Sequence, residues 1–228
     1  MFQQALSFSW LPAALSVLVR GAGVTILLTT QAVLYGSVVA IVGAWAKTGG
    51  PKWLAALFSV YIEIIRNTLL LQLFFFFFGM PTVGLHLTPT QTALLAMVVN
   101  LGAYATEIIR AGVEAIPHGQ FEAGAALGFN PVQVFLLIIL VPALQVIYPP
   151  LAAQFTMILL GSSLASAISA NELTGTANSL ASENFRTLEV YFVVTIIYLF
   201  LVFFFRLLFA IMYNFVLARG PSQKMRVL

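Results

Sequence analysis

The feature that most constrains this chain is an uncharged run long enough to cross a lipid bilayer. Residues 21–46 contain no Asp, Glu, Lys or Arg, and Arg20 and Lys47 bound the run. A helix needs about 20 apolar residues to span the hydrocarbon core of a membrane. Charged side chains make up 7% of the whole chain, against about 25% in soluble domains. So few ionic groups cannot cover a water-facing surface, and the sequence therefore predicts an integral membrane protein.

Similar segments along the chain predict an all-α membrane protein with about five transmembrane helices. The predicted segments are 21–46, 53–79, 89–109, 132–160 and 187–217. We treat residues 1–228 as a single membrane domain with its core at about 20–217. Pro142, Pro149 and Pro150 remove backbone donors from the fourth segment, and we expect its helix to be kinked or broken there.

Two further regions have a distinct composition. Residues 161–186 are rich in Ser, Ala and Asn, and they predict a short re-entrant or surface helix followed by a loop. The phenylalanine run 74–78 would cover every face of a helix. We interpret it as bulk for lipid contact and packing.

The positions of Lys and Arg predict the orientation in the membrane. Lys47 and Lys52 lie in the first loop, Arg110 lies beside the central loop, and the tail 218–228 is basic. With an odd number of spans these three places lie on one side, and short cytoplasmic loops carry an excess of Lys and Arg. We therefore expect the N-terminus outside, and the central loop and the C-terminal tail in the cytoplasm.

The chain lacks the residues that catalysis or metal binding would need. It has no cysteine, and its two histidines, His86 and His118, fall in separate loops, so we predict no metal site. A phosphate-binding loop needs the pattern G-x-x-x-x-G-K-[ST], and the nearest stretch, 43–48, lacks the second glycine. The net charge of +3 is too small to indicate a nucleic-acid partner. The sequence therefore predicts no catalytic residue and no cofactor bound by this chain.

The loop between the third and fourth segments, about 111–131, is polar and has a helical pattern of its own. It contains Glu122, Ala123 and Gly124, then Gly128 after three more residues, and the apolar run that follows reaches Pro142. This pattern resembles the signature of permease subunits of binding-protein-dependent ABC importers. In that family Glu-Ala-Ala is followed after three residues by Gly, and then by an apolar run ending in proline.

Other stretches resemble the polar amino-acid subfamily of these permeases, so the likeness covers most of the chain. They are YIEIIRNTLL at 61–70, QLFF at 72–75, GAYATEIIRAGVEAIPHGQ at 102–120, PPL at 149–151, QF at 154–155, and the stretch from SL at 163–164 to EL at 172–173. The chain departs from the family pattern at Gly124, at Pro142 and at Leu69. Leu160 and Gly161 also stand where many members carry Lys-Asp, which weakens any transfer of solute specificity.

The resemblance implies a type I ABC importer permease fold in a bacterial inner membrane. It also implies partners: ABC ATPase subunits that bind ATP and Mg²⁺, a second permease subunit that is identical or paralogous, and an extracytoplasmic solute-binding protein that delivers a polar amino acid or related small solute. One alternative is a secondary amino-acid transporter driven by an ion gradient, which usually carries inverted repeats and a coupling-ion site. No convincing repeat is visible in the sequence, and that alternative leaves the alanine-rich loop unexplained.

For the central loop, the resemblance implies a short coupling helix that sits in a groove of the ATPase. Ala123 and Gly124 with the next two alanines would form a small-residue surface that another backbone can approach. Glu122 would meet a basic group or a helix N-terminus on the partner. Gly128 would end the helix in a left-handed cap. The alternative is an ordinary hairpin loop whose alanines reflect helix propensity.

Polar side chains inside the predicted spans are candidates for the solute path, because a polar group in lipid is costly. Asn100 and Tyr104 lie four residues apart, on one helix face in mid-span. Glu63 and Arg66 are three residues apart and either neutralise each other or line the path.

The remaining polar residues have weaker patterns. The hydroxyls of Ser162 and Ser163 would suit the carboxylate of an amino acid, by the family resemblance, or would equally make one face of a helix soluble. Glu107 and Arg110 are interpreted as a structural ion pair. Arg206 is interpreted as a side chain that reaches toward the cytoplasmic interface.

Overall fold

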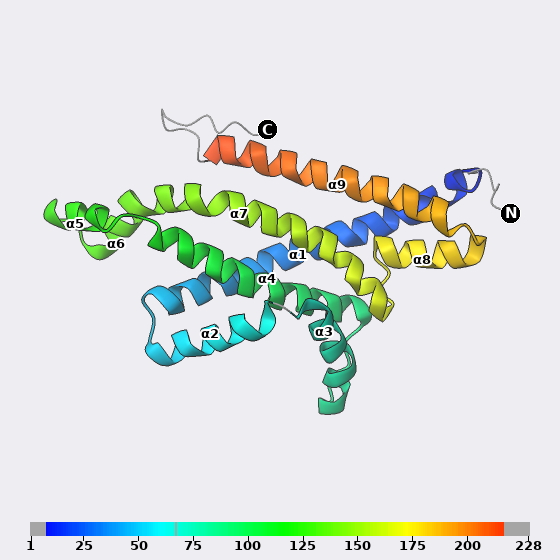
Figure 1. Cartoon of the computed structure of the whole chain (residues 1–228), viewed down its shortest axis with the longest axis horizontal. Coiled ribbons are helices and arrows are strands. Elements are labelled where there is room, and N and C mark those ends of the chain that lie inside the picture. Colours follow the sequence, from blue (N-terminus) through cyan, green and yellow to red (C-terminus); the bar gives the residue numbers. More distant parts are fainter. Residues whose placement is uncertain (1–7, 67, 217–228) are drawn as a thin grey trace.

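The computed structural model describes residues 8–66 and 68–216, and this part of the chain contains helices and no strand. Four long helices run along the molecule (Figure 1). They are α1 (Leu11–Thr48), α4 (Pro89–Glu114), α7 (Leu140–Gly161) and α9 (Thr187–Val216). The shorter elements are α2 (Lys52–Ile65), α3 (Leu69–Phe74), η1 (Phe75–Gly79), η2 (Met80–Val83), α5 (His118–Ala126), α6 (Pro131–Val134), η3 (Phe135–Ile139), η4 (Ser162–Ile168) and α8 (Leu173–Asn184).

Within the described residues, 4 helical stretches are long and apolar enough to cross a membrane. They are Leu11–Thr48, Pro89–Glu114, Pro131–Ile168 and Thr187–Phe215. The all-helical membrane fold predicted from composition is therefore confirmed. The predicted starts near Pro89 and Thr187 agree with the observed helices, whereas α1 begins ten residues before the predicted start at Gly21.

The predicted second span is not one continuous helix. The chain leaves helical geometry between α2 and α3, and α3 then points away from the long helices (Figure 1). The carbonyl oxygen of Ile65 at this break accepts hydrogen bonds from Gln72 Nε2 (2.7 Å) and Asn100 Nδ2 (3.4 Å). Broken backbone at membrane depth persists only where such groups are bonded. The expectation of one helix over 53–79 is wrong because side chains from α3 and α4 stabilise the break.

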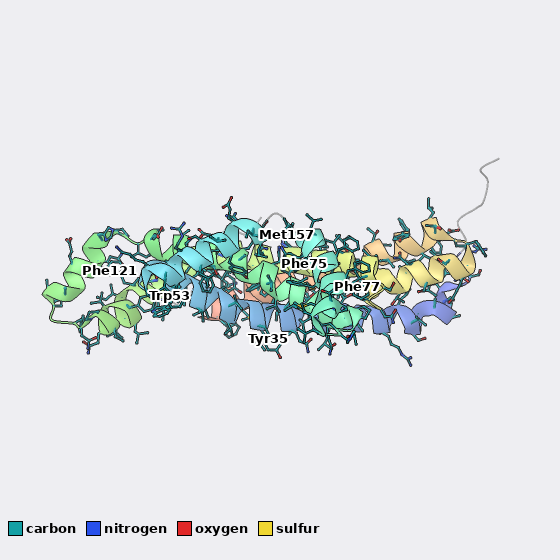
Figure 2. The ribbon with its side chains drawn as sticks, turned by 90° about the horizontal axis from the view of Figure 1, so that it is seen from below. Tyr35, Trp53, Phe75, Phe77, Phe121 and Met157 are labelled. Carbon is teal, nitrogen blue, oxygen red and sulfur yellow. The ribbon has the colours of Figure 1, made fainter. Side chains whose placement is uncertain are left out.

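The phenylalanine run forms the end of α3 and the π turn η1. Phe75 and Phe78 are 69% and 65% exposed. Phe74, Phe76 and Phe77 pack against a small core that includes Ala93 of α4 and Ala165 of η4. The run therefore supplies both surface and packing bulk, as predicted, and Figure 2 places Phe75 and Phe77 near the middle of the molecule.

The sequence predicts a fourth span that is kinked or broken at its prolines. The span is helical throughout, so the break is absent. Helix α7 continues through Pro149 and Pro150, and it contacts α1, α4 and α9. The irregularity lies earlier, in the π turn η3, which contains Ile138, the residue one turn before Pro142. A wider turn relieves the clash between a proline ring and the carbonyl of the preceding turn.

Helices α1 and α4 cross closely because small residues line their contact. A Cβ atom on Gly36 would lie 2.9 Å from Leu101 Cδ2, and one on Gly102 would lie 2.7 Å from Val39 Cγ1. Ala32, Ala40 and Ala105 are buried in the same core. Helices in membranes associate through such small residues, since lipid is as apolar as their side chains.

The two ends of the molecule differ. The α1–α2 turn, α5, α6 and the C-terminal end of α9 lie at one end, and α8 and the start of α1 lie at the other (Figure 1). Phe121 of α5 and Trp53 of α2 mark the first end in Figure 2. The first loop and the central loop therefore share an end, as the positions of Lys and Arg predicted. The basic tail 218–228 lies outside the described residues.

Candidate functional site

Helix α5 packs against its own chain on one side and is open on the other. Gly124 is buried, and a Cβ atom there would lie 2.8 Å from Val134 Cγ2 and 2.9 Å from Ile138 Cδ1. Glu122 and Ala123 are exposed. The predicted small-residue surface therefore needs one correction: Gly124 faces α6 and η3 of this chain because the hairpin folds back on it.

The predicted left-handed cap at Gly128 is present, with a φ angle of 81°. The amide of Gly128 donates to the Ala125 carbonyl (3.0 Å), and the amide of Phe129 donates to the Gly124 carbonyl (3.2 Å). These two bonds form a Schellman motif, which satisfies the last carbonyls of a helix. The cap turns the chain back into the next span.

We call the open side of this hairpin the α5 surface. It consists of the exposed residues Glu122, Ala123, Ala125, Ala126, Leu127 and Val132. Leu127 is 73% exposed and Val132 is 65% exposed. Glu122 takes part in none of the ion pairs within the described residues. The α5 surface thus offers small and apolar groups beside one unpaired carboxylate.

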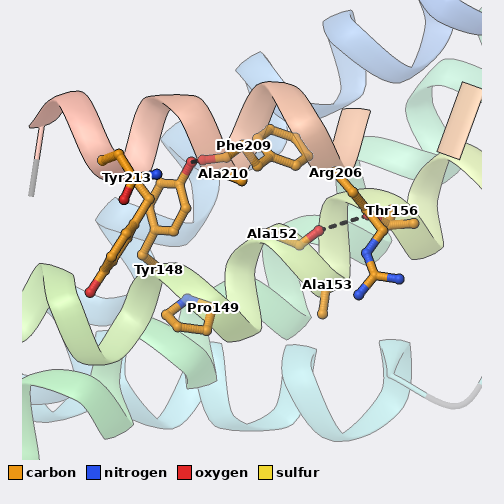
Figure 3. A pocket seen from close by; sticks show the side chains of 10 residues that line it. Tyr148, Pro149, Ala152, Ala153, Thr156, Arg206, Phe209, Ala210 and Tyr213 are labelled. Carbon is orange, nitrogen blue, oxygen red and sulfur yellow. Dashed lines mark hydrogen bonds between the residues drawn. The ribbon is translucent and has the colours of Figure 1, made fainter. Parts of the chain in front are cut away.

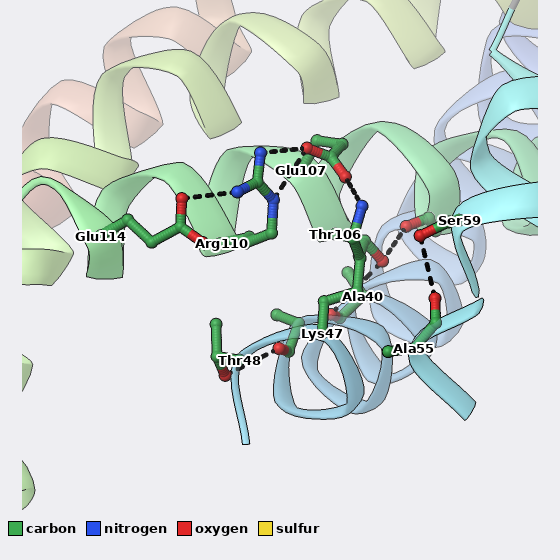
Figure 4. A network of polar contacts seen from close by, with 11 residues as sticks. Ala40, Lys47, Thr48, Ala55, Ser59, Thr106, Glu107, Arg110 and Glu114 are labelled. Atoms are coloured by element: carbon green, nitrogen blue, oxygen red, sulfur yellow. Dashed lines mark hydrogen bonds and ion pairs between the residues drawn. The ribbon is translucent and has the colours of Figure 1, made fainter. Parts of the chain in front are cut away.

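The bundle beneath α5 is held by a chain of four charged residues (Figure 4). The predicted pair is confirmed, with Arg110 Nη2 2.8 Å from Glu107 Oε2. Glu107 also pairs with Lys47, and Arg110 Nη1 lies 2.5 Å from Glu114 Oε2. This network ties the end of α1 to the end of α4, and its extension to Lys47 depends on how the two helices cross.

Glu63 and Arg66 form no ion pair with each other. The guanidinium carbon of Arg66 instead lies 5.1 Å from the centre of the Tyr104 ring. Glu63 is exposed. The pairing alternative is wrong for this structure because α2 ends at Ile65 and Arg66 turns toward α4.

Asn100 and Tyr104 share a helix face, as predicted, and both contact the break after α2. Asn100 Nδ2 donates to the Ile65 carbonyl, and Tyr104 Oη donates to the Arg66 carbonyl. Asn100 is 4% exposed. Both side chains therefore hold the unwound backbone in place.

Ser162 and Ser163 begin the 3-10 helix η4. Their hydroxyls donate to the carbonyls of Leu159 and Leu160, at 2.7 Å in each case. A Cβ atom on Gly161 would lie 3.5 Å from Leu69 Cδ2 at the start of α3. The fold thus brings η4 next to the broken α2–α3 region, which the sequence could not show.

The burial of Glu172 was not predicted from the sequence. Its side chain is 0% exposed and caps α8, accepting from the amides of Thr174 (2.9 Å) and Gly175 (2.8 Å). It also accepts from Thr25 Oγ1 of α1 (3.3 Å) and Tyr198 Oη of α9 (2.9 Å). An acidic residue just before a helix indicates a cap, but the ties to α1 and α9 come from tertiary structure.

Comparison with known proteins shows which family shares this sequence and fold. Residues 36–218 match the family described as binding-protein-dependent transport system inner membrane component. The chain is 36% identical over 178 residues to the L-cystine transport system permease protein TcyB of Bacillus subtilis (strain 168), which covers 78% of this chain and 76% of the relative. It is 32% identical over 200 residues to the glutamine transport system permease protein GlnP of Escherichia coli (strain K12), which covers 85% of this chain and 91% of the relative.

The fold also matches a solved structure described as an amino acid ABC transporter with histidines. The TM-score is 0.86 at 29% sequence identity, covering 93% of this chain and 100% of that one. The family match covers most of the chain and includes both the α5 surface and the broken α2–α3 region. The chain therefore belongs to the family of binding-protein-dependent transport system inner membrane components.

Proposed function

We propose that this permease imports polar amino acids or chemically related small solutes. The observation that carries the proposal is the similarity, along most of the chain, to permeases named for the transport of L-cystine and of glutamine. Solutes of that kind carry a carboxylate and an ammonium group, so their path must offer hydrogen-bonding groups within the membrane.

The chain is the membrane-spanning permease subunit of an ATP-driven importer and not an enzyme, as its family membership shows. Its family works with an ATPase subunit and a binding protein. For the assembled transporter we further propose two ATPase subunits, which hold ATP and Mg²⁺, and a second permease subunit that is identical or paralogous. An importer driven by an ion gradient is not favoured, because the family couples transport to ATP.

We place the N-terminus outside the inner membrane, and α5 and the C-terminus in the cytoplasm. The end of α1, which carries Lys47, and the start of α2, which carries Lys52, lie toward the α5 end of the molecule (Figure 1). Arg110 lies in the last turns of α4 and shares Glu107 with Lys47. These positions support the orientation by the positive-inside rule. It also places the α5 surface in the cytoplasm, where ATP is available to an ATPase subunit.

In this proposal the α5 surface docks on the ATPase. The hairpin is packed firmly enough to transmit movement, because Ile116, Val134 and Ile139 form one core with Ile147 of α7. A Cβ atom on Gly112 of α4 would lie 2.1 Å from Ile147 Cγ1. Displacement of α5 when the ATPase closes would therefore shift α4 and α7 together and switch access between the two sides of the membrane.

The solute path is proposed to run past the broken α2–α3 region and η4. Glu63 and Arg66 supply charges that do not neutralise each other, and Asn100 and Tyr104 fix the unwound backbone beside them. Ser162 and Ser163 both donate to their own helix and keep hydroxyl lone pairs. Ser163 is partly exposed, whereas Ser162 is 0% exposed and would meet a solute only after η4 moves. Transporters commonly bind solutes at such discontinuous helices.

The test is the ATPase activity of the reconstituted transporter, containing the ATPase, the second permease and the binding protein. The double variant Glu122→Lys, Gly128→Asp changes the α5 surface and its cap, and we expect it to abolish stimulation by loaded binding protein. Glu183→Lys repeats the acid-to-base change of Glu122→Lys at an exposed site of α8, at the other end, and should leave stimulation intact. A double variant that assembles and is stimulated like the wild type rules out docking at α5.

Screening single amino acids in the same assay identifies the solute. If none of them stimulates the ATPase activity, the proposed solute class is refuted.

A further inference from the structure

A groove lies between α7 and α9, in the part of α9 that leads toward the α5 end (Figure 3). It holds about 250 Å³. Its walls combine apolar and polar groups, and its one cation is Arg206 among the described residues that line it. The Arg206 side chain extends from α9 across α7 beside Ala153 (Figure 3).

Within the described residues, Arg206 has no acidic partner. The sequence has 7 acidic residues, and all of them lie in the described part. None of them lines the groove, and no ion pair in the described part involves Arg206. A cation within a membrane-spanning helix is costly unless an anion or water reaches it. We therefore expect an anion to bind in the groove beside Arg206.

The other polar groups of the groove are neutral. Tyr148 Oη donates to the Phe209 carbonyl, and Thr156 Oγ1 donates to the Ala152 carbonyl at 3.0 Å, so the protons of these two hydroxyls are already engaged and Arg206 carries the one full charge among the described lining residues. The Tyr213 hydroxyl and the Asn214 amide add further donors, and the amide also offers a carbonyl acceptor. A zwitterionic solute would bring an ammonium group that finds no carboxylate here. A group with net negative charge fits better.

The depth of Arg206 indicates where that group sits. Residues 190–205 of α9 carry no charge, and they rise about 24 Å along the helix axis. The hydrocarbon core of a bilayer is about 30 Å thick. An α9 that enters the core near Val190 places the backbone of Arg206 about 6 Å short of the far boundary of the core. The long arginine side chain covers that distance and reaches the headgroups of the leaflet on the α5 side. Ala152, Ala153 and Phe209 then offer an apolar wall beside it.

We propose that this groove binds an anionic phospholipid of the leaflet on the α5 side. The guanidinium of Arg206 holds the phosphate through charge-assisted hydrogen bonds, and an acyl chain lies along the apolar wall of α7 and α9. This proposal needs only the membrane-spanning fold, so it stands or falls separately from the solute and the docking role of α5.

The experiment measures which lipids remain bound to the assembled transporter. The complex is reconstituted in nanodiscs of equal phosphatidylglycerol and phosphatidylcholine, released, and analysed by native mass spectrometry. The wild type should retain phosphatidylglycerol preferentially. Arg206→Gln should lower that preference about fivefold, the effect of one basic side chain near an anionic headgroup. Arg206→Lys should keep most of the preference, and Ala153→Trp should reduce the lipid retained by filling the groove.

Arg20→Gln is the matched control, since it removes an exposed arginine from α1 and should change nothing. Unchanged phosphatidylglycerol preference in Arg206→Gln overturns the proposal. If that variant instead separates the two permease subunits with lipid retention unaltered, the occupant is a carboxylate of the second permease. If millimolar glutamine displaces the lipid from the wild type, the groove belongs to the solute path.

Discussion

Helices α4 and α9 are both apolar enough to cross a membrane, yet the chain covers them to very different extents. In the most apolar 18-residue window, 56% of α4 is buried against other parts of the protein, but only 11% of α9. Ala and Gly on α4 let α1 approach closely, whereas the outward residues of α9 are mainly Phe, Leu and Ile. The ability to cross a membrane therefore conceals two roles: small residues mark contacts within the chain, and bulky ones mark surface left to lipid or a partner.

The largest expected effect comes from forcing α1 and α4 apart. In Gly102→Leu the new side chain would begin 2.7 Å from Val39 Cγ1 and 2.8 Å from Tyr61 Oη. We expect a loss of about 3 kcal/mol or more in the free energy of unfolding, because overpacking shifts whole helices. Denaturant unfolding in detergent measures it. Gly23→Leu is the control, since a Cβ atom there meets nothing within 4 Å. Equal stability of the two variants would contradict the close crossing.

The next effect concerns the polar tie that the fully buried Glu172 makes between α9 and the bundle. Glu172→Ala removes the acceptor of Thr25, Tyr198 and two amides of α8. We expect the free energy of unfolding to fall by about 2 kcal/mol, since buried donors would lose their partners. Glu172→Gln keeps the shape and should lose less. Glu183→Ala, at an exposed site of the same helix, should be neutral. If Glu172→Ala left the free energy of unfolding unchanged, α8 would need no buried cap.

A smaller effect is expected from the ion pairs at the ends of α1 and α4. Glu107→Gln leaves Lys47 and Arg110 without their shared carboxylate, whose side chain is 20% exposed. Partly exposed pairs contribute about 1 kcal/mol or less, so unfolding should become easier by about that amount. High salt should shrink the difference between wild type and variant. Glu63→Gln, which breaks no pair, serves as the comparison, and an equal loss there would argue against a specific network.

The smallest effect is expected on the outward face of α9. Phe203 is 60% exposed, and Phe203→Ala should change the unfolding free energy of the isolated permease by less than about 0.5 kcal/mol. Leu201→Ala on the same helix removes a side chain that is 7% exposed and should cost about 2 kcal/mol or more. Both variants are then measured in the assembled transporter. If Phe203→Ala lowers the free energy of unfolding in the assembled transporter and not in the isolated permease, a partner covers this face of α9.

The sequence by itself determined that the chain lies in a membrane, the approximate limits of its long helices, and the cap at Gly128. These features depend on composition over about 20 residues or on the chemistry of one turn. The family pattern around Glu122 was also readable, because it is contiguous. The pair of Glu107 and Arg110 was predictable from its spacing along one helix.

Only the tertiary structure decided the break after Ile65, the inward position of Gly124 and the burial of Glu172. Two of these depend on residues far apart in the sequence, because Asn100 bonds the break and Tyr198 reaches Glu172. The third depends on how the hairpin folds back, because Val134 covers Gly124. In a chain where nearly every segment is apolar, hydropathy cannot tell which face meets another helix and which meets lipid. That choice follows from how closely side chains allow two helices to approach, and it is fixed when the helices pack.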